Sequence, residues 1–239
     1  MNFQIAIPSK GRAGLITSQK IFKSAVIYVP ENELKQYDIY PNKIIGIPIE
    51  IKGITETRNW ILKNNNCNIF FLDDDLQYGG YIERTEEKCK VKRITDEYIY
   101  INEIKKLFEI TEQTNCRIFG LFTIANNLTI YAFNPFLFNG VCLGSCMGII
   151  NDGSYYFDED FKVKEDYELT LRHITERGLI VRSNILFMQH EHTQLRGGCR
   201  DSNRIQKEKE AVKKLMKMYP GMIREAKHRG TSFAIQLNN

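Results

Sequence analysis

The chain has 239 residues, of which 43% are apolar and 26% charged, with a formal net charge of +4. This is ordinary globular composition for one large domain or two small ones, and 16 glycines and 6 prolines exclude collagen-like and low-complexity classes. No apolar run approaches the roughly 20 residues that cross a bilayer. The N-terminus lacks a basic region ahead of an apolar segment, so we expect no signal peptide and a cytoplasmic protein.

Alternating strands and helices are predicted over the first half of the chain. The predicted strands are 3–8, 25–29, 43–47 and 67–72, and the predicted helices are 15–22 and 57–63. This order predicts a parallel sheet with helices on both faces, in which ligands bind at the carboxyl ends of the strands. The loop 9–12 and the acidic run 73–75 both follow strands directly, so we expect both at that edge.

The second half is less regular. The predicted helices are 95–115, 165–177 (closed by Gly178) and 202–219, and the predicted strands are 117–123 and 128–133, with 179–192 mostly extended. We find no internal repeat and no flexible linker, which favours one compact domain with a tail.

Charge and cysteines are unevenly placed. From Arg196 to the end, eleven Lys and Arg stand against four Asp and Glu, a net of +7, so residues 1–195 sum to −3. The six cysteines have irregular spacing and no CxxC, so we expect reduced thiols rather than a zinc or disulfide framework.

An apolar strand runs into three carboxylates at residues 70–75, Phe-Phe-Leu-Asp-Asp-Asp. Carboxylates a few ångströms apart repel one another, and a divalent cation relieves that repulsion. Oxygen ligands suit Mg²⁺ or Mn²⁺, which take further ligands from substrate phosphates and water. On an extended chain Asp73 and Asp75 share one face and Asp74 points elsewhere. The alternative is an acidic turn.

The loop 9–12, Ser-Lys-Gly-Arg, has neither Walker A nor GxGxxG spacing. A glycine-containing loop between a strand and a helix still points backbone N–H groups at an anion, and Lys10 and Arg12 add positive charge. Arg58, at the next predicted helix start, offers a guanidinium suited to bidentate phosphate contact. An ordinary turn and an exposed arginine are the alternatives.

Glu165 and Asp166 lie at a predicted helix N-terminus. The helix dipole stabilises carboxylates there, so capping alone explains them. The functional alternative is a general base, with an Asp beside a bound sugar donor taking the proton from an attacking hydroxyl.

Two histidines lie near the end of the extended segment. If the chain is extended there, His190 and His192 share one face, and either imidazole could join Asp75 on a metal. A histidine is equally explained as a polar surface or core residue. The pair Gly197-Gly198 follows, which suggests a mobile loop able to close over a phosphate group.

The predicted helix 202–219 is strongly charged. Its apolar positions form one stripe and most of its lysines lie off that stripe. This pattern is typical of the solvated face of an amphipathic helix, and equally of a surface that tracks the phosphates of DNA.

Taken in order, these motifs resemble a GT-A glycosyltransferase. More narrowly, the chain is similar to the TET/JBP-associated glycosyltransferase family, which includes the base J glucosyltransferase and many phage enzymes. The resemblance runs from about Ile5 to Cys199. It implies an α/β, Rossmann-like fold with a mixed, mostly parallel sheet flanked by helices. Residues 1–200 would form the GT-A domain, and 201–239 a basic C-terminal helical extension packed on it.

The resemblance also implies roles for residues. Those that would bind the nucleotide-sugar are Pro8, Ser9, Lys10, Arg12, Arg58, Asp73 and Asp74. Asp75 would bind Mn²⁺ or Mg²⁺, with His190 completing the metal site and His192 as its rival. Asp166 would be the catalytic base, with Glu165 as its rival.

The resemblance predicts an inverting, metal-dependent transfer of a sugar, with glucose expected, from a UDP-sugar to the hydroxymethyl group of a modified pyrimidine in DNA. A phage or bacterial enzyme without a membrane partner fits this. The aromatic residues Tyr78, Tyr81, Phe136 and Phe138 could stack on a base, although core packing explains them better. The alternatives are a saccharide or protein acceptor, an inactive GT-A domain that binds DNA, and a nucleotidyltransferase.

Overall fold

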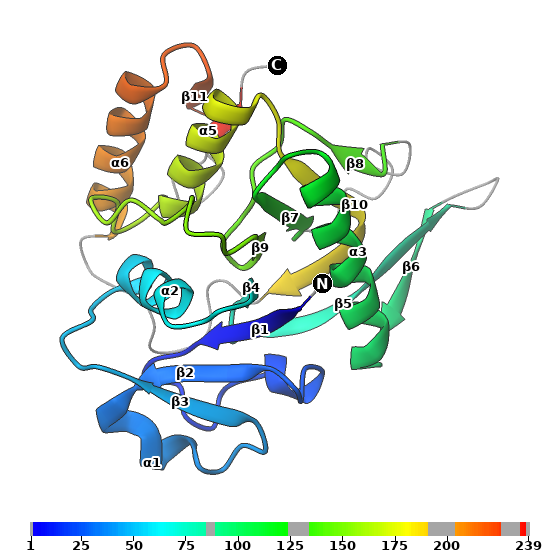
Figure 1. Cartoon of the computed structure of the whole chain (residues 1–239), viewed down its shortest axis with the longest axis vertical. Coiled ribbons are helices and arrows are strands. Elements are labelled where there is room, and N and C mark those ends of the chain that lie inside the picture. Colours follow the sequence, from blue (N-terminus) through cyan, green and yellow to red (C-terminus); the bar gives the residue numbers. More distant parts are fainter. Residues whose placement is uncertain (1, 85–88, 124–133, 191–203, 226–234, 238–239) are drawn as a thin grey trace.

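The computed structural model describes residues 2–84, 89–123, 134–190, 204–225 and 235–237. Within these ranges, a large mixed sheet runs through the molecule in the order β3-β2-β1-β4-β9-β7-β10-β5-β6, and β8 pairs with β10 (Figure 1). A separate two-stranded sheet joins β11 and β12.

The four strands predicted in the first half are present and mutually parallel. They are β1 (Phe3–Pro8), β2 (Val26–Pro30), β3 (Lys43–Ile47) and β4 (Asn68–Leu72). Their apolar residues alternate between two core clusters: Phe70 and Leu72 belong to one, and Ile69 and Phe71 to the other. This alternation shows that the sheet is covered on both faces, as a nearly continuous apolar strand requires.

The second half breaks the parallel pattern. Its strands are β5 (Leu76–Arg84), β6 (Cys89–Ile94), β7 (Ile118–Phe122), β8 (Phe136–Leu137), β9 (Cys146–Ile149), β10 (Val181–His190), β11 (Ile223–Glu225) and β12 (Ile235–Leu237). Strand β9 inserts antiparallel between β4 and β7, and β5 is antiparallel to both β10 and β6. The expectation of a mixed sheet is confirmed, but that of a mostly parallel one is wrong: five of the nine described pairings in the main sheet are antiparallel. The β5–β6 pair was not predicted because two antiparallel strands can be joined by a short turn, and the sequence between these two strands has no strong turn signal.

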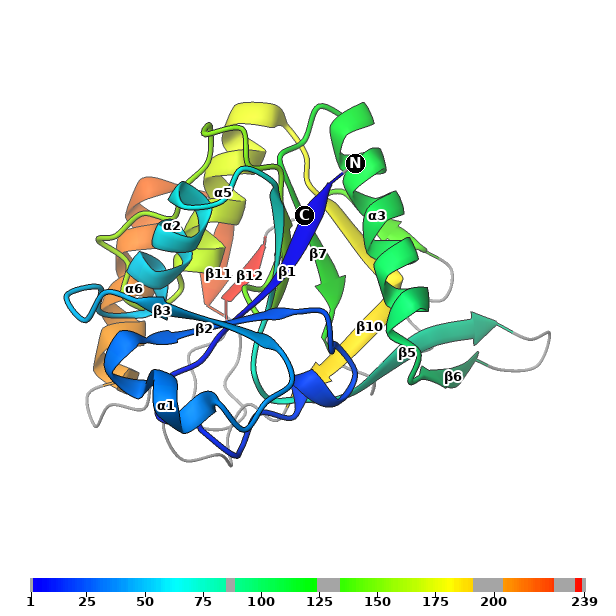
Figure 2. The same ribbon diagram turned by 60° about the horizontal axis from the view of Figure 1, so that its bottom comes forward.

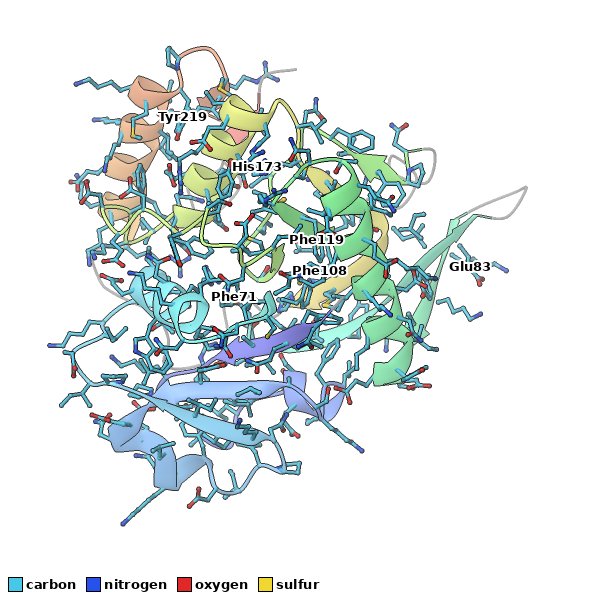
Figure 3. All side chains as sticks on the ribbon, in the orientation of Figure 1. Phe71, Glu83, Phe108, Phe119, His173 and Tyr219 are labelled. Carbon is cyan, nitrogen blue, oxygen red and sulfur yellow. The ribbon has the colours of Figure 1, made fainter. Side chains whose placement is uncertain are left out.

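Helices cover both faces of the sheet. The α-helices described are α1 (Leu34–Tyr37), α2 (Ile54–Lys63), α3 (Glu97–Gln113), α5 (Glu165–Arg177) and α6 (Arg204–Met218), with short 3-10 helices at Ser18–Lys20 and Glu31–Glu33. Helix α3 packs Phe108 edge-on against Phe119 of β7 on one face, with ring centroids 4.8 Å apart (Figure 3). Helices α2 and α5 contribute Ile61 and Leu169 to the cluster on the other face (Figure 1).

The helix predicted over 15–22 is wrong. Gly14 has a φ of +78°, and only Ser18–Lys20 forms a helical turn. The segment instead serves the acidic run, because the backbone N–H of Thr17 donates to the Asp74 carbonyl at 2.9 Å and the Ser18 hydroxyl donates to the Asp73 carbonyl. These tertiary hydrogen bonds replace the intrahelical ones.

Helix α6 packs against α5. Leu171 of α5 shares an apolar cluster with Val212 and Leu215 of α6, and the Tyr219 hydroxyl donates to buried Glu168 at 3.0 Å. Figure 3 shows Tyr219 at the end of α6, facing α5. The charged face of α6 is therefore turned away from its partner helix.

In the described part of the chain, none of the helices has the length and apolar character needed to cross a membrane. The strand predicted at 128–133 lies outside the described residues. The four cysteines whose state is described, Cys67, Cys116, Cys142 and Cys146, are free thiols.

Gly148 tests the packing of the central strands. A Cβ at this position in β9 would lie 2.0 Å from the Phe119 ring. We expect Gly148→Ala to lower the free energy of unfolding by about 1–3 kcal/mol, because the ring must leave its place in a filled core. Denaturant unfolding measures this. Lys105→Ala, at an exposed position of α3, is the control and should change stability by no more than ~0.5 kcal/mol; equal stabilities of the two variants would contradict the packing described here.

Candidate active site

The carboxyl ends of β1 and β4 lie side by side. The two strands pair in parallel with Ala6 opposite Phe71, so the loop after β1 and the acidic run after β4 leave the sheet next to each other. His190 at the end of β10 contacts Asp75, and Glu165 at the start of α5 contacts Arg58, so both elements reach the same region. The polar motifs of the sequence therefore meet at one edge of the sheet, the edge where β10 ends in Figure 2.

Asp74 holds the loop after β1. The Ser9 hydroxyl donates to Asp74 Oδ2 at 2.7 Å, and the Arg12 guanidinium forms an ion pair with Oδ1. Asp74 is 4% exposed; burial raises the pKa of its carboxyl, as does the nearby Asp73, against the lowering effect of Ser9 and Arg12. Asp74 is thus an internal anchor for this loop.

Tyr37 of α1 also holds the loop after β1 in place. Its buried hydroxyl accepts a hydrogen bond from the Arg12 backbone N–H at 3.0 Å and lies 3.2 Å from the Ser9 hydroxyl. Glu33 accepts from the Gly11 backbone N–H at 2.7 Å. Gly11 has a φ of +64°, a conformation that glycine adopts without strain. The loop is therefore already ordered within the protein itself.

Asp75 and His190 form a buried pair. His190 Nδ1 lies 3.2 Å from Asp75 Oδ1, and His190 Nε2 lies 3.0 Å from the Cys146 sulfur. Burial lowers the pKa of His190, but the adjacent Cys146 and Asp75 raise it to about 10 overall. The surroundings of Asp75 therefore favour a positive charge, which Arg12, 3.9 Å from Asp75 Oδ2, also supplies.

Asp75 and His190 are close enough to bind one divalent cation together. A carboxylate oxygen and an imidazole nitrogen this close can be two ligands of one ion once the ion displaces the proton that the raised pKa keeps on His190. Cys146 contacts the opposite ring nitrogen. Among the described residues, no group of three or more His, Cys, Asp and Glu could hold a metal ion. Two side chains could therefore hold an ion only together with further ligands, which substrate phosphates and water can supply to Mg²⁺.

Arg58 connects the acidic run to α5. It is 3% exposed, donates to Glu165 Oε1 at 2.6 Å and to the Gly144 carbonyl at 2.9 Å, and lies 3.4 Å from Asp73 Oδ1. Its guanidinium also stacks 5.5 Å from the centre of the Phe157 ring. A buried arginine with two carboxylate neighbours is held in one orientation, since each contact removes a rotamer choice.

Glu165 and Asp166 have different surroundings. Glu165 is 7% exposed and points to Arg58; burial, and secondarily the neighbouring Asp166, raise its pKa to about 7. Asp166 is half-buried and accepts hydrogen bonds from the backbone N–H of Gly144 at 3.1 Å and of Tyr167 at 2.9 Å. Glu165 thus forms an ion pair, whereas the partners of the Asp166 carboxylate within the described residues are backbone N–H groups.

The acidic run does not alternate as an extended chain would. The backbone turns at Asp74 and Asp75, so the expectation that Asp73 and Asp75 share a face is wrong. Asp73 lies toward Arg58 and Asp75 toward His190. The turn separates the three carboxylates onto three different cations, which offsets their repulsion.

The remaining predicted residues have simpler surroundings. Pro8 ends β1, half-buried beside Tyr28, and Lys10 is exposed. His192 and the pair Gly197-Gly198 lie outside the described residues. Of the aromatic candidates, Tyr78, Tyr81 and Phe136 are half-buried, and Phe138 is 49% exposed.

Besides Tyr37 and Glu33, sequence reasoning missed Ser18, Gly144 and Cys146 in the site. Ser18 bridges the acidic turn by donating to the Asp73 carbonyl and accepting from the Leu76 N–H at 3.0 Å. Gly144 binds both Arg58 and Asp166 through its backbone, and a Cβ there would lie 2.4 Å from the Arg58 guanidinium. Cys146 contacts His190. Only the glycine-rich character of 141–150 gave any signal in the sequence.

The fold is that of GT-A glycosyltransferases. The structure of glucosyl-3-phosphoglycerate synthase from Mycobacterium tuberculosis, in complex with Mn²⁺, uridine diphosphate and phosphoglyceric acid, is similar with a TM-score of 0.56 at 11% identity, covering 98% of this chain and 86% of that chain. S. aureus TarS 1–349 in complex with UDP-GlcNAc is similar with a TM-score of 0.52 at 12% identity, covering 90% and 67%. The chain spans 60% of the length of two other structures of this TarS fragment, one of them with UDP.

Residues 3–198 match the family described as TET-Associated Glycosyltransferase. The match covers most of the chain, which therefore belongs to this family of glycosyltransferases. No curated protein sequence matches the chain.

The raised pKa of Glu165 predicts a pH-dependent stability. Its pKa moves from 4.5 to about 7 on folding, so the folded state binds the proton more tightly than the unfolded state. The stability that this shift contributes to the folded state is fully present below about pH 4.5 and is lost as the pH rises through 7. We therefore expect the stability of the wild type, relative to Glu165→Gln, to fall between pH 5 and pH 8 in denaturant unfolding. Glu109→Gln, exposed on α3, is the control; parallel profiles for wild type and Glu165→Gln would disprove the shift.

Proposed function

We propose that the chain is a metal-dependent, inverting glycosyltransferase that moves a sugar from a UDP-sugar to the hydroxymethyl group of a modified pyrimidine in DNA. The observation that carries this proposal is the convergence of the loop 9–12, the acidic turn 73–75, Arg58 and Asp166 at one edge of a GT-A sheet. Membership of the TET-associated family supports the DNA acceptor.

The donor site is built by the ordered loop after β1. Similar structures hold UDP-GlcNAc, or Mn²⁺ with uridine diphosphate, which supports a UDP-sugar donor. Pro8, Ser9, Lys10 and Arg12 would contact the nucleotide, and Asp74 would keep Ser9 and Arg12 in place. Farther along the same edge, Arg58 would bind the diphosphate and Asp73 the ribose or sugar.

Asp75 and His190 would hold Mn²⁺ or Mg²⁺. The cation, when bound, neutralises charge that develops on the departing diphosphate. Asp75 supplies a hard oxygen, and the contact of Cys146 with Nε2 leaves Nδ1 of His190 on the side of Asp75. The ring orientation is thereby set by the protein.

Asp166 would act as the general base. The acceptor oxygen attacks the anomeric carbon, the bond from that carbon to the diphosphate oxygen breaks, and the hydroxyl proton passes to the Asp166 carboxylate. Backbone N–H groups of Gly144 and Tyr167 hold that carboxylate in place. Glu165 forms an ion pair with Arg58, so it would position the arginine and would not accept the proton.

A transfer assay tests the proposal. A panel of UDP-sugars with Mn²⁺ or Mg²⁺ is offered duplex DNA that carries hydroxymethylcytosine, hydroxymethyluracil or unmodified pyrimidines, and products are read by mass. A gain of one sugar on hydroxymethylated DNA alone is the expected result. UDP release with transfer to a saccharide or protein would move the acceptor elsewhere, and absence of both transfer and UDP binding would leave an inactive domain.

Asp75→Ala should abolish transfer. It removes the carboxylate of the proposed cation site, so UDP affinity measured by calorimetry should no longer increase when Mn²⁺ is added. Asp38→Ala removes an exposed carboxylate far along the chain and is the matched control. Full activity of the Asp75→Ala variant would contradict the role of Asp75 as a metal ligand.

The Asp166→Asn variant should still bind the UDP-sugar donor but should lose turnover. The amide oxygen can still accept from Gly144 but cannot take a proton, so we expect kcat to fall by about 10²–10⁴-fold with UDP-sugar affinity unchanged. Glu165→Gln is the comparison and should retain far more turnover than Asp166→Asn. The reverse order would make Glu165 the base.

A further inference from the structure

The hairpin formed by β5 and β6, here called the β5–β6 ribbon, extends outward past α3 (Figures 1 and 2). We propose that the exposed cations of β6 bind the phosphates of a DNA duplex and so hold the acceptor strand at the site. This inference rests on the proposed function, because it names the surface that receives the proposed acceptor.

The ribbon is joined to the candidate site by the backbone. Strand β5 begins at Leu76, the residue after Asp75, and Leu76 pairs with His190 of β10. Both proposed metal ligands are therefore adjacent to the base of the ribbon. A strand rises about 3.4 Å per residue, so Tyr78 lies roughly 10 Å and Glu83 roughly 27 Å along the chain from Asp75. A polymer seated along the ribbon would pass the site.

The base of the ribbon is rigidly packed. The two glycines of β5 allow close contacts: a Cβ at Gly79 would lie 2.6 Å from the Tyr100 hydroxyl, and one at Gly80 would lie 2.1 Å from the Lys92 carbonyl. Tyr78 packs edge-on against Phe187 of β10, with ring centroids 6.1 Å apart. The ribbon therefore leaves the sheet in a defined direction.

Strand β6 is basic and lies at the edge of the described sheet. Its six residues include Lys90, Lys92 and Arg93 and no acidic residue, and all three cations are exposed. Lys90 and Lys92 share one face of the ribbon and Arg93 lies on the other, because side chains alternate along a strand. Arg93 stacks over the Tyr78 ring at 4.2 Å, close to the site.

Glu83 is the acidic partner of this surface. It lies 3.3 Å from Lys92, with the two side chains 53% and 66% exposed, and Figure 3 shows it out on the ribbon. Exposed ion pairs contribute little to stability, so Lys92 can exchange this carboxylate for another anion.

Duplex DNA matches the charge of the ribbon. It presents one negative charge per roughly 1.7 Å of axis, and the cations stand on the edge strand of the described sheet, where no neighbouring described strand covers them. Among the described residues, helix α6 also carries exposed cations, and its ion pairs Arg204–Glu208 and Lys214–Asp160 leave their cations at least partly exposed, as the pair Lys92–Glu83 does. The direct connection to Asp75 and His190 favours the ribbon over α6.

The test compares two triple variants of the full chain. Lys90→Gln/Lys92→Gln/Arg93→Gln removes the ribbon cations, and Lys213→Gln/Lys217→Gln/Arg224→Gln removes three exposed cations of α6 and β11. Fluorescence anisotropy measures binding to a hydroxymethylated duplex over a salt series. For the ribbon variant we expect binding weaker by at least about tenfold and a slope of log K against log salt reduced by about 2–3. UDP affinity should stay unchanged, and the α6 variant should resemble wild type.

Glu83→Gln provides a test that does not depend on loss of function. It frees Lys92 from its carboxylate neighbour, so we expect severalfold tighter DNA binding with a steeper salt dependence. Unchanged or weaker binding would argue against a role for Lys92.

The outcomes separate this inference from the proposed function. If wild type glycosylates DNA and the ribbon variant binds and modifies it equally well, the ribbon inference is overturned and the function stands. Loss of binding in the α6 variant alone overturns it in the same way. If wild type transfers sugar to another acceptor and shows no salt-sensitive DNA binding, both proposals fail.

Discussion

Three consecutive carboxylates at the end of a buried strand are tolerated because each lies against a different cation. Asp73 lies beside Arg58, Asp74 binds Arg12, and Asp75 contacts His190. Each cation comes from a different part of the chain, so offsetting the repulsion draws the loop after β1, helix α2 and strand β10 to one place. The contacts that neutralise the acidic turn are therefore also the contacts that assemble the site.

The antiparallel insertion of β9 completes this arrangement. The turn that leads into β9 places Gly144 between Arg58 and Asp166, where its carbonyl binds one and its N–H the other. The same strand carries Cys146, which contacts His190. If β9 were parallel to β4, its first residues would lie at the edge of the sheet opposite the site, because parallel strands all begin at the same edge.

The two acidic residues at the start of α5 illustrate how burial divides roles between neighbours. Glu165 is buried, paired with Arg58, and has a raised pKa. Asp166 is more open and is held by backbone N–H groups, which orient a carboxylate without adding a counter-charge. A residue that must take a proton and release it is better served by the second environment than by a buried ion pair.

The sequence by itself determined the strands β1 to β4, helices α3, α5 and α6, and the residue types gathered at the site, because apolar periodicity and helix caps are local signals. It did not determine the turn at Asp74–Asp75, the loss of a helix over 15–22, or the contacts of Glu165 and Asp166. Hydrogen bonds from Thr17 and Ser18 to the acidic turn decide the first two, and they join residues more than fifty positions apart. Only the tertiary structure brings such groups together, because side-chain partners depend on which strands are neighbours and not on local spacing.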